Sequence, residues 1–299
     1  MKGITNNIVM VRPKSFGFNQ ETVLSNTFQN NEKIKNLSLV ALNEFDEMVK
    51  ALRSNLINVT VLDDLCNPIK PDAIFPNNWF SLHNGTLILY PMANFNRRIE
   101  RTEEHIESIK MIGNVSKSID YSIMEKQNEF LEGTGSLVLD RYSRVAYACL
   151  SSRTSETLLD KWCSDMDYKS CVFKAYQNEN IIYHTNVMMS IGNGFAVVCM
   201  DSIKSANDKK RLIQSFEKSR HQIIDISIDQ MNNFAGNVLV VENAKGDAKF
   251  IISERAFNSL NEFQLLEISK YAKPLPIPIN VIEKVGGGGV RCMMAEVFS

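Results

Sequence analysis

The sequence predicts a mixed α/β fold. Short strand-like segments alternate with amphipathic helical segments along the whole chain of 299 residues. No repeat of fixed period is visible, which argues against a solenoid. No Pro/Ser-rich linker divides the chain, so residues 1–299 are expected to form one domain.

The strand predictions rest on short runs of β-branched and aromatic residues bounded by turn residues. The segment "NVMMSIGNGFAVVCM" is interpreted as a hairpin, because Gly192, Asn193 and Gly194 tolerate positive φ. The predicted strands are Ile8–Arg12, Val59–Leu62, Thr86–Tyr90, Ser136–Asp140, Val145–Leu150, Cys171–Ala175, Val187–Ile191, Phe195–Met200, Ile223–Ile228, Val238–Val241 and Phe250–Ile252.

The helix predictions rest on apolar residues spaced by three and four, which form one buried face. Thr154 or Ser155 is expected to cap the helix that carries the second of these stripes. The stripes are Phe45, Met48, Val49 and Leu52; Leu158, Leu159, Trp162, Cys163 and Met166; Leu212, Ile213 and Phe216; and Phe263, Leu266, Ile268 and Tyr271.

The charge balance argues against a nucleic-acid-binding protein. The 33 Lys and Arg residues nearly match the 34 Asp and Glu residues, for a formal net charge of −1. A nucleic-acid surface would show a basic surplus or a clustered basic stripe. The short basic groups Arg97–Arg98 and Lys209–Arg211 have acidic neighbours and are interpreted as solvated helix faces.

Export and membrane signals are not visible in the sequence. The N-terminal "MKGITNNIVMVRP" lacks the apolar stretch of a signal peptide, and no run approaches the length of a membrane span. The six cysteines are scattered, without CxxC pairs, and are expected to be reduced thiols. These features predict a cytoplasmic protein.

The segment "PDAIFPNNWF" holds two adjacent amides, Asn77 and Asn78, within an apolar frame. Asparagine pairs usually mark turns. A solvated turn would not need the apolar residues around it, so these amides are also candidates for lining a buried polar site.

Near the C-terminus, "VGGGGVRCMMAEVF" places Cys292 three residues after four glycines. Glycines let the backbone adopt unusual conformations and let a ligand approach closely. The alternative is a flexible loop that leads into a buried strand with an inert cysteine. No GK[ST] follows, so the segment is not a phosphate-binding P-loop.

Three further residues are candidates when taken together with Cys292. His184, in "IIYHTNVMMS", suits proton transfer near neutral pH, although a buried structural histidine is the simpler alternative. Glu132, in "FLEGTGSLVLD", is a carboxylate at a tight turn. Arg153, between a strand and a helix, can clamp a substrate carboxylate or form a surface ion pair. A thiol, an imidazole and a carboxylate supply a nucleophile and two acid/base groups.

The ordered set "PDAIFPNNWF", "EGTG…LSSRT", "YHTN" and "GGGGVRC" resembles the guanidino-group modifying enzymes, the amidinotransferase or pentein superfamily. Relatives there include arginine deiminase, dimethylargininase, glycine amidinotransferase and succinylarginine dihydrolase. The resemblance implies a five-bladed α/β propeller of ββαβ-type modules with pseudo-fivefold symmetry. It is strongest to the bacterial citrulline-utilisation hydrolases.

The resemblance also implies roles for particular residues. Cys292, His184 and Glu132 would be catalytic, and Arg153 would bind the substrate α-carboxylate. The remaining substrate-binding residues would be Asp72, Asn77, Asn78 and Asn186.

The sequence departs from many relatives in having amides where they carry acids, at Asn186 and at the pair Asn77 and Asn78. An amide offers an uncharged donor and acceptor, which match a neutral ureido group better than two anions do. The expected reaction is therefore hydrolysis of citrulline to ornithine, carbon dioxide and ammonia through a covalent Cys292 intermediate.

Other functions remain open from the sequence. They are hydrolysis of a guanidino substrate as in arginine deiminase or dimethylargininase, transfer of an amidino group, and a non-catalytic propeller that acts as a binding module. A papain-like protease is disfavoured, because the catalytic cysteine of those proteases lies early in the chain, whereas Cys292 lies near the end of this one. No metal or organic cofactor is expected. The expected partner is a small amino-acid substrate, not nucleic acid or a membrane, and a homodimer is the one assembly considered.

Overall fold

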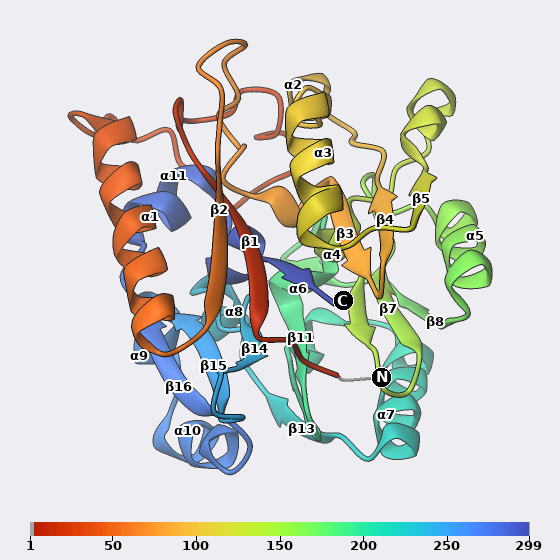
Figure 1. The fold of residues 1–299 in the computed structure, drawn as a ribbon. Coiled ribbons are helices and arrows are strands. Elements are labelled where there is room, and N and C mark those ends of the chain that lie inside the picture. Colours follow the sequence, from red (N-terminus) through yellow and green to blue (C-terminus); the bar gives the residue numbers. More distant parts are fainter. Residues whose placement is uncertain (1–2, 299) are drawn as a thin grey trace.

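The computed structural model describes residues 3–298. Within that range, the strands form five three-stranded sheets and one two-stranded ribbon. Figure 1 shows the longer helices at the periphery and the sheets inside them. The mixed α/β fold predicted from the sequence is confirmed.

The three-stranded sheets share one topology. The first two strands pair antiparallel, and the third pairs parallel with the second after a helical crossover. Four of these sheets, in chain order, are β3 (Phe80–His83), β4 (Thr86–Leu89) and β5 (Lys117–Asp120); β6 (Val138–Asp140), β7 (Val145–Cys149) and β8 (Lys169–Phe173); β11 (Met189–Gly192), β12 (Phe195–Val198) and β13 (Gln222–Asp225); and β14 (Leu239–Glu242), β15 (Ala248–Ser253) and β16 (Lys273–Ile277).

The fifth sheet joins the two ends of the chain. Strand β17 (Ala295–Val297) pairs antiparallel with β1 (Asn7–Arg12), and Asn7 lies opposite Val297. Strand β1 then pairs parallel with β2 (Asn58–Asp63). This pairing holds the C-terminal segment that carries Cys292 against the N-terminal strand. The separate ribbon is formed by β9 (Tyr176–Gln177) and β10 (Asn180–Ile181).

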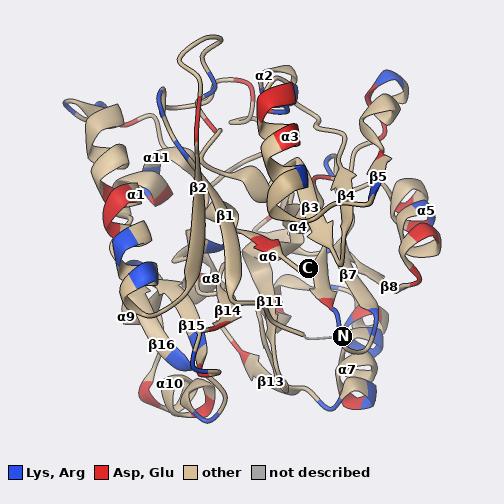
Figure 2. Ribbon diagram, in the orientation of Figure 1, with Lys and Arg blue, Asp and Glu red and all other residues tan. Residues whose placement is uncertain are grey.

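The crossover helices pack apolar faces on the sheets, and all of them except the first in chain order begin at a side-chain cap. The hydroxyl of Ser155 accepts a hydrogen bond from the backbone of Leu158, which confirms Ser155 as the cap. The crossover helices are α1 (Leu37–Ser54), α3 (Glu103–Ile112), α5 (Glu156–Met166), α7 (Ala206–Ser219), α9 (Glu254–Ser259) and α10 (Glu262–Ser269). Figure 2 shows lysine, arginine and acidic residues interspersed on the outer faces of these helices.

The apolar stripe predicted for the last of these helices is confirmed at Ile268 and wrong at Phe263 and Leu266, which are 69% and 62% exposed. The other buried side chains of α10 are Gln264 and Glu267. Gln264 forms a capping box with Asn261 at the helix start, which turns that face of the helix inward.

A short helical turn precedes the first strand of each three-stranded sheet, and these turns carry or adjoin most of the candidate site residues. Turns η1 (Pro76–Asn78), α4 (Gly133–Ser136), α6 (Thr185–Met188) and η4 (Val290–Met293) lead into β3, β6, β11 and β17. Helix α8 (Ile228–Asn232) and a following turn lead into β14. Contacts link α4 with both η1 and α6, and η1 with η4, so these turns gather in one place.

The remaining elements are α2 (Phe95–Arg98), η2 (Ser122–Gln127), η3 (Met200–Ser202) and α11 (Asn280–Gly286). Two of the predicted strands begin too early, because Ser136 and Val187 lie in the turns α4 and α6. All six cysteines lie in the described range and are free thiols, as predicted. No helix among residues 3–298 combines the length and the apolar character needed to cross a bilayer.

Candidate active site

Cys292 lies in the turn η4 and is 6% exposed. The preceding loop is held at its start by α11, whose first backbone N–H groups, on Val281 and Ile282, donate to the Glu44 carboxylate. Gly287 ends that helix with a φ of +64°. A Cβ on Gly288 would lie 3.3 Å from the Cβ of Cys292, so the chain needs glycine there to pass the nucleophile closely.

Two amides contact the Cys292 sulfur. The Nδ2 of Asn237 lies 3.3 Å from Sγ, and the Nδ2 of Asn186 lies 3.6 Å from it. Burial raises the pKa of the Cys292 thiol, and the Asn237 hydrogen bond and the Arg291 charge offset only part of that rise. The free thiol is therefore protonated at neutral pH and needs a base or a bound substrate to become a thiolate.

His184 and Glu132 form a buried pair. The Nε2 of His184 lies 2.7 Å from Oε2 of Glu132, and both side chains are 3% exposed or less. Burial lowers the pKa of His184 to about 4, against the opposing effect of Glu132. Burial also opposes charge on Glu132, but Arg153 and His184 prevail and bring its pKa to about 2. At neutral pH this is a neutral imidazole held by a carboxylate.

Arg153 lies on the other side of Glu132, with its Nη1 3.5 Å from Oε2. Its guanidinium stacks 4.7 Å from the centroid of the Tyr183 ring and donates from Nη2 to the carbonyl of Thr22 at 3.2 Å. The Ser25 hydroxyl accepts from Nε at 3.0 Å. Arg153 is buried beneath the segment that contains Thr22 and Ser25.

Asp72 and Asn78 also line the pocket, and each presents a polar atom without a partner among residues 3–298. Oδ2 of Asp72 accepts from Asn19 at 2.7 Å, whereas its Oδ1 has no partner among the described residues. Burial raises the pKa of Asp72. Oδ1 of Asn78 accepts from Arg97 at 2.6 Å, which leaves the Nδ2 donor of Asn78 buried without a partner in residues 3–298.

Arg97 corrects a prediction made from the sequence. It was interpreted as part of a solvated helix face, but it is 3% exposed and lines the pocket. Glu100 accepts from its Nε and Nη2 at 2.8 Å and 2.9 Å, and the Phe75 carbonyl accepts at 3.0 Å. This bidentate pairing neutralises the buried guanidinium, whereas the neighbouring Arg98 stays partly exposed.

Two of the predicted substrate-binding residues do not line this pocket. Asn77 is fully buried, and its amide donates to the hydroxyl of Thr134 at 3.3 Å. Asn186 lies behind Cys292, where its backbone carbonyl accepts from Asn237 at 2.9 Å. Asn237 was not predicted from the sequence as a site residue. It lies just before β14, in the same position relative to its strand as the other turns that carry site residues.

The pocket between these residues has a volume of about 20 Å³, room for roughly one water molecule. The N-terminal segment 19–29 closes it from outside, with Asn26 donating to the carbonyl of Gly287 at 3.2 Å. A substrate the size of an amino acid therefore requires this segment to move. Among residues 3–298, no group of histidine, cysteine and acidic side chains has an arrangement that could hold a metal ion.

The fold matches solved structures over nearly its whole length. The substrate-bound N-terminal domain of ArgZ, described as an arginine dihydrolase of the ornithine–ammonia cycle in cyanobacteria and crystallised as a cysteine-to-serine variant, superposes with a TM-score of 0.77 at 14% identity. The match covers 98% of both chains. Full-length apo ArgZ gives 0.76 at 15% identity over 98% of this chain, which spans only 40% of the ArgZ chain.

A third solved structure is a histidine-to-glycine variant of dimethylarginine dimethylaminohydrolase with an S-methyl-L-thiocitrulline adduct. It matches with a TM-score of 0.65 and 14% identity, over 98% of this chain and 99% of that one. At these identities, the likeness establishes the fold. Among curated proteins, no sequence match reaches significance.

The sequence model for "N,N dimethylarginine dimethylhydrolase, eukaryotic" matches residues 12–299. That range includes every residue of the buried site described above. Since the match extends over nearly the whole chain, the chain belongs to this family of hydrolases, within the guanidino-group modifying, or pentein, superfamily.

Proposed function

We propose that this chain is a cysteine-dependent hydrolase of citrulline, which it converts with one water to ornithine, carbon dioxide and ammonia. The observation that carries the proposal is the Nδ2 of Asn78, a buried donor without a partner in the described range. Arg97 fixes the orientation of this amide by taking its Oδ1, so the pocket presents a donor. A ureido oxygen accepts such a hydrogen bond, whereas a guanidinium has no acceptor to offer.

The charge of the pocket supports a neutral reacting group. Arg97 and Arg153 both line it, and Asp72 has a raised pKa because it is buried. Glu100 and Glu132 already pair with these two guanidinium groups, so a neutral ureido group needs no further counter-charge. Its N–H groups suit the unpaired Oδ1 of Asp72, and Arg153 would bind the substrate α-carboxylate once the segment 19–29 opens.

Catalysis would proceed through a covalent intermediate. The Cys292 thiol passes its proton to His184 as the sulfur attacks the ureido carbon, and the imidazolium gives that proton to the ornithine nitrogen as the C–N bond breaks. His184, neutral again, then takes a proton from water, which attacks the S-linked carbamoyl carbon. The proton returns to the departing Cys292 sulfur, and the released carbamate breaks down to carbon dioxide and ammonia. Glu132 holds the imidazole and stabilises its protonated form, as the 2.7 Å contact permits.

Arginine is the second candidate substrate, and Asp72 favours it. The carboxylate lines the pocket with one oxygen unpaired among the described residues, and an ionised Asp72 would pair with a guanidinium. The structural neighbour ArgZ is described as an arginine dihydrolase, which supports the same alternative. Deimination would then give citrulline and ammonia. Amidino transfer remains the further alternative.

We also propose that residues 1–299 form one catalytic domain whose five sheets close into a five-bladed propeller. The shared topology of the sheets supports this arrangement. Contacts between the first strands of neighbouring sheets also support it, since β17 lies beside β3, and β11 lies beside both β6 and β14. The turns that carry Cys292, His184 and Glu132 would then lie around one axis.

The test is a substrate panel of citrulline, arginine, agmatine and succinylarginine, with ornithine, citrulline and ammonia measured. We expect citrulline turnover that is abolished in Cys292→Ala and retained in Cys66→Ala, which removes an exposed thiol. Faster consumption of arginine than of citrulline would reject the ureido assignment. Turnover of none of the four would favour a non-catalytic binding module, whereas full activity of Cys292→Ala would reject Cys292 as the nucleophile.

A further inference from the structure

A second, larger cavity lies behind the layer that holds Cys292. Its volume is about 460 Å³, and it is lined by the first strands β6, β11, β14 and β17 together with Ile4. This volume falls within the roughly 300–1,000 Å³ typical of small-molecule pockets. The cavity shares no lining residue with the pocket at Cys292. Asn186 is part of its lining, and the Asn186 amide also contacts the Cys292 sulfur.

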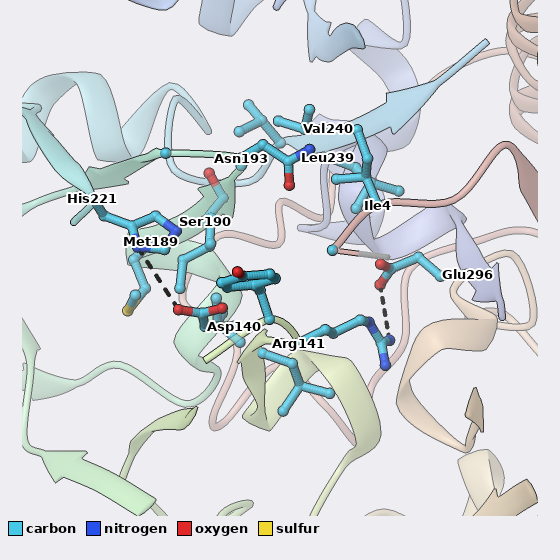
Figure 3. Close-up of a pocket in the computed structure, with 18 of the residues that line it drawn as sticks. Ile4, Asp140, Arg141, Met189, Ser190, Asn193, His221, Leu239, Val240 and Glu296 are labelled. Carbon is cyan, nitrogen blue, oxygen red and sulfur yellow. Dashed lines mark ion pairs between the residues drawn. The ribbon is translucent and has the colours of Figure 1, made fainter. Parts of the chain in front are cut away.

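The charged side chains on one side of this cavity pair with one another. Glu296 pairs with Arg291 at 2.8 Å and with Arg141 at 3.6 Å. Arg141 also donates to Nδ1 of His83 at 2.8 Å. Figure 3 shows Glu296 and Arg141 together at one side of the cavity. These groups already satisfy one another and leave little demand for an added charge.

Asp140 lies at the other side, and its one ion-pair contact among residues 3–298 is with His221, which is charged only when protonated. Asp140 is 3% exposed, and its Oδ1 accepts from the backbone of Ser143 at 2.9 Å. Its Oδ2 is buried without a hydrogen-bond partner in residues 3–298. No lysine or arginine in that range forms an ion pair with this carboxylate. The Nδ1 of His221 lies 3.7 Å from Oδ2, beyond hydrogen-bond distance, and already bonds to the Ser219 hydroxyl at 2.8 Å. Figure 3 shows the Asp140 carboxylate in the cavity, facing His221.

A buried carboxylate oxygen without a donor is energetically unfavourable. A primary ammonium supplies the missing charge and up to three N–H donors. Beyond Asp140, the walls are apolar at Ile4, Leu239 and Val240, and uncharged polar groups come from Ser190 and Asn193. The one other cation on the lining, Arg220, is solvent-exposed at the rim.

We propose that this cavity binds a small organic cation, a primary ammonium on a short aliphatic body, with the ammonium on Asp140 and the aliphatic part against Ile4, Leu239 and Val240. The site is separate from the pocket at Cys292 and does not depend on the function proposed for that pocket. Asn186 lines this cavity and also contacts the Cys292 sulfur, so it links the two sites.

The test is calorimetric titration of the full chain at pH 7 with n-butylammonium chloride and with 1-butanol, its neutral counterpart of similar shape. We expect saturable binding of n-butylammonium, at least about tenfold tighter than 1-butanol, because a buried ion pair forms only with the amine. Asp140→Asn keeps the acceptor for Ser143 and should remove this difference. The matched control Asp160→Asn removes an exposed acid and should keep it, as should Cys292→Ser.

Three results would overturn the proposal. They are no saturable binding of n-butylammonium, equal affinity for the amine and the alcohol, and unchanged amine affinity in Asp140→Asn. A thermal melt of each variant checks that it is folded. If Asp140→Asn does not fold, Ser190→Leu replaces it, since the larger side chain occupies the cavity from β11 and should also abolish amine binding.

Discussion

The imidazole of His184 and the carboxylate of Glu132 lie 2.7 Å apart, both buried, with the carboxylate ionised and the imidazole neutral at neutral pH. This arrangement suits a histidine that gains a proton during turnover, because the carboxylate stabilises the imidazolium only when it forms. Oε1 of Glu132 is meanwhile fixed by the backbone N–H of Ala93 at 2.9 Å.

Glu132→Gln is therefore expected to lower kcat by about 10²–10⁴-fold, the range typical for the loss of acid/base assistance. Glutamine keeps an acceptor for Ala93, so the fold should survive. Steady-state kinetics on the substrate identified by the panel measure the effect. Glu104→Gln, on the exposed face of α3, serves as the control. A Glu132→Gln enzyme with wild-type kcat would remove Glu132 from the mechanism.

Cys292 is expected to react slowly with iodoacetamide at pH 7 and faster as the pH rises, with a midpoint above its ordinary 9.0. The physical reason is burial, which raises the pKa of the thiol. Mass spectrometry after timed alkylation separates Cys292 from the exposed thiol of Cys66. A midpoint below neutral pH would show that the free enzyme already holds a thiolate.

The pH dependence of stability follows from the same pair. The pKa of His184 is lowered to about 4 in the folded chain, so on acidification the unfolded chain binds this proton first. The free energy of unfolding is therefore fully retained above about pH 6.5 and falls as the pH drops towards 4. The Glu132 pKa of about 2 lies below its usual 4.5, so its contribution is lost between those values.

Urea unfolding followed by tryptophan fluorescence should therefore give a lower free energy of unfolding at pH 5 than at pH 7. His184→Asn should show a smaller difference between these two pH values, because the titrating group is gone. If the free energy of unfolding changes equally between pH 5 and pH 7 in the wild type and in His184→Asn, His184 is not the group responsible.

The sequence predicted the repeating elements of the fold because their patterns are local. The helix of Phe45 and Met48 and the hairpin around Gly192 each follow from periodicity or turn residues within a few positions. Strand β17 could not be predicted in the same way, because its partner β1 lies at the opposite end of the chain. Strand β16, not predicted, contains Pro274 and Pro276, which resemble loop residues in the sequence.

The site was predictable only where residues stand in recognisable motifs. Cys292, His184 and Glu132 are in such motifs, and the structure places Glu132 against His184. Arg97 was missed because a pair of arginines beside a helix is typical of a surface, and its burial depends on Glu100 and Asn78, the latter 19 positions away. Asn237 carried a weak signal, its place just before a strand.

Asn78→Asp is expected to shift substrate preference from citrulline towards arginine by at least about tenfold in the ratio of kcat/KM values, since a buried donor is replaced by an anion. The aspartate keeps an acceptor for Arg97. Asn77→Asp is the matched control, because that neighbouring amide faces Thr134 and not the pocket. An unchanged ratio in Asn78→Asp would mean that the ureido oxygen binds elsewhere.

Gly287→Ala tests the segment that covers the site. Gly287 has a φ of +64°, and a Cβ there would lie 2.7 Å from Cγ of Gln29 and 2.8 Å from Nδ2 of Asn26. Gly246 has a φ of +84°, but its Cβ would come no nearer than 3.7 Å to the Glu242 side chain. Both alanine variants should lose about 1–2 kcal/mol of stability through the left-handed backbone. Only Gly287→Ala should also raise KM, because it displaces Asn26 and Gln29 from the closed cover. A KM that rises equally in both variants, or in neither, would show that this cover does not control substrate binding.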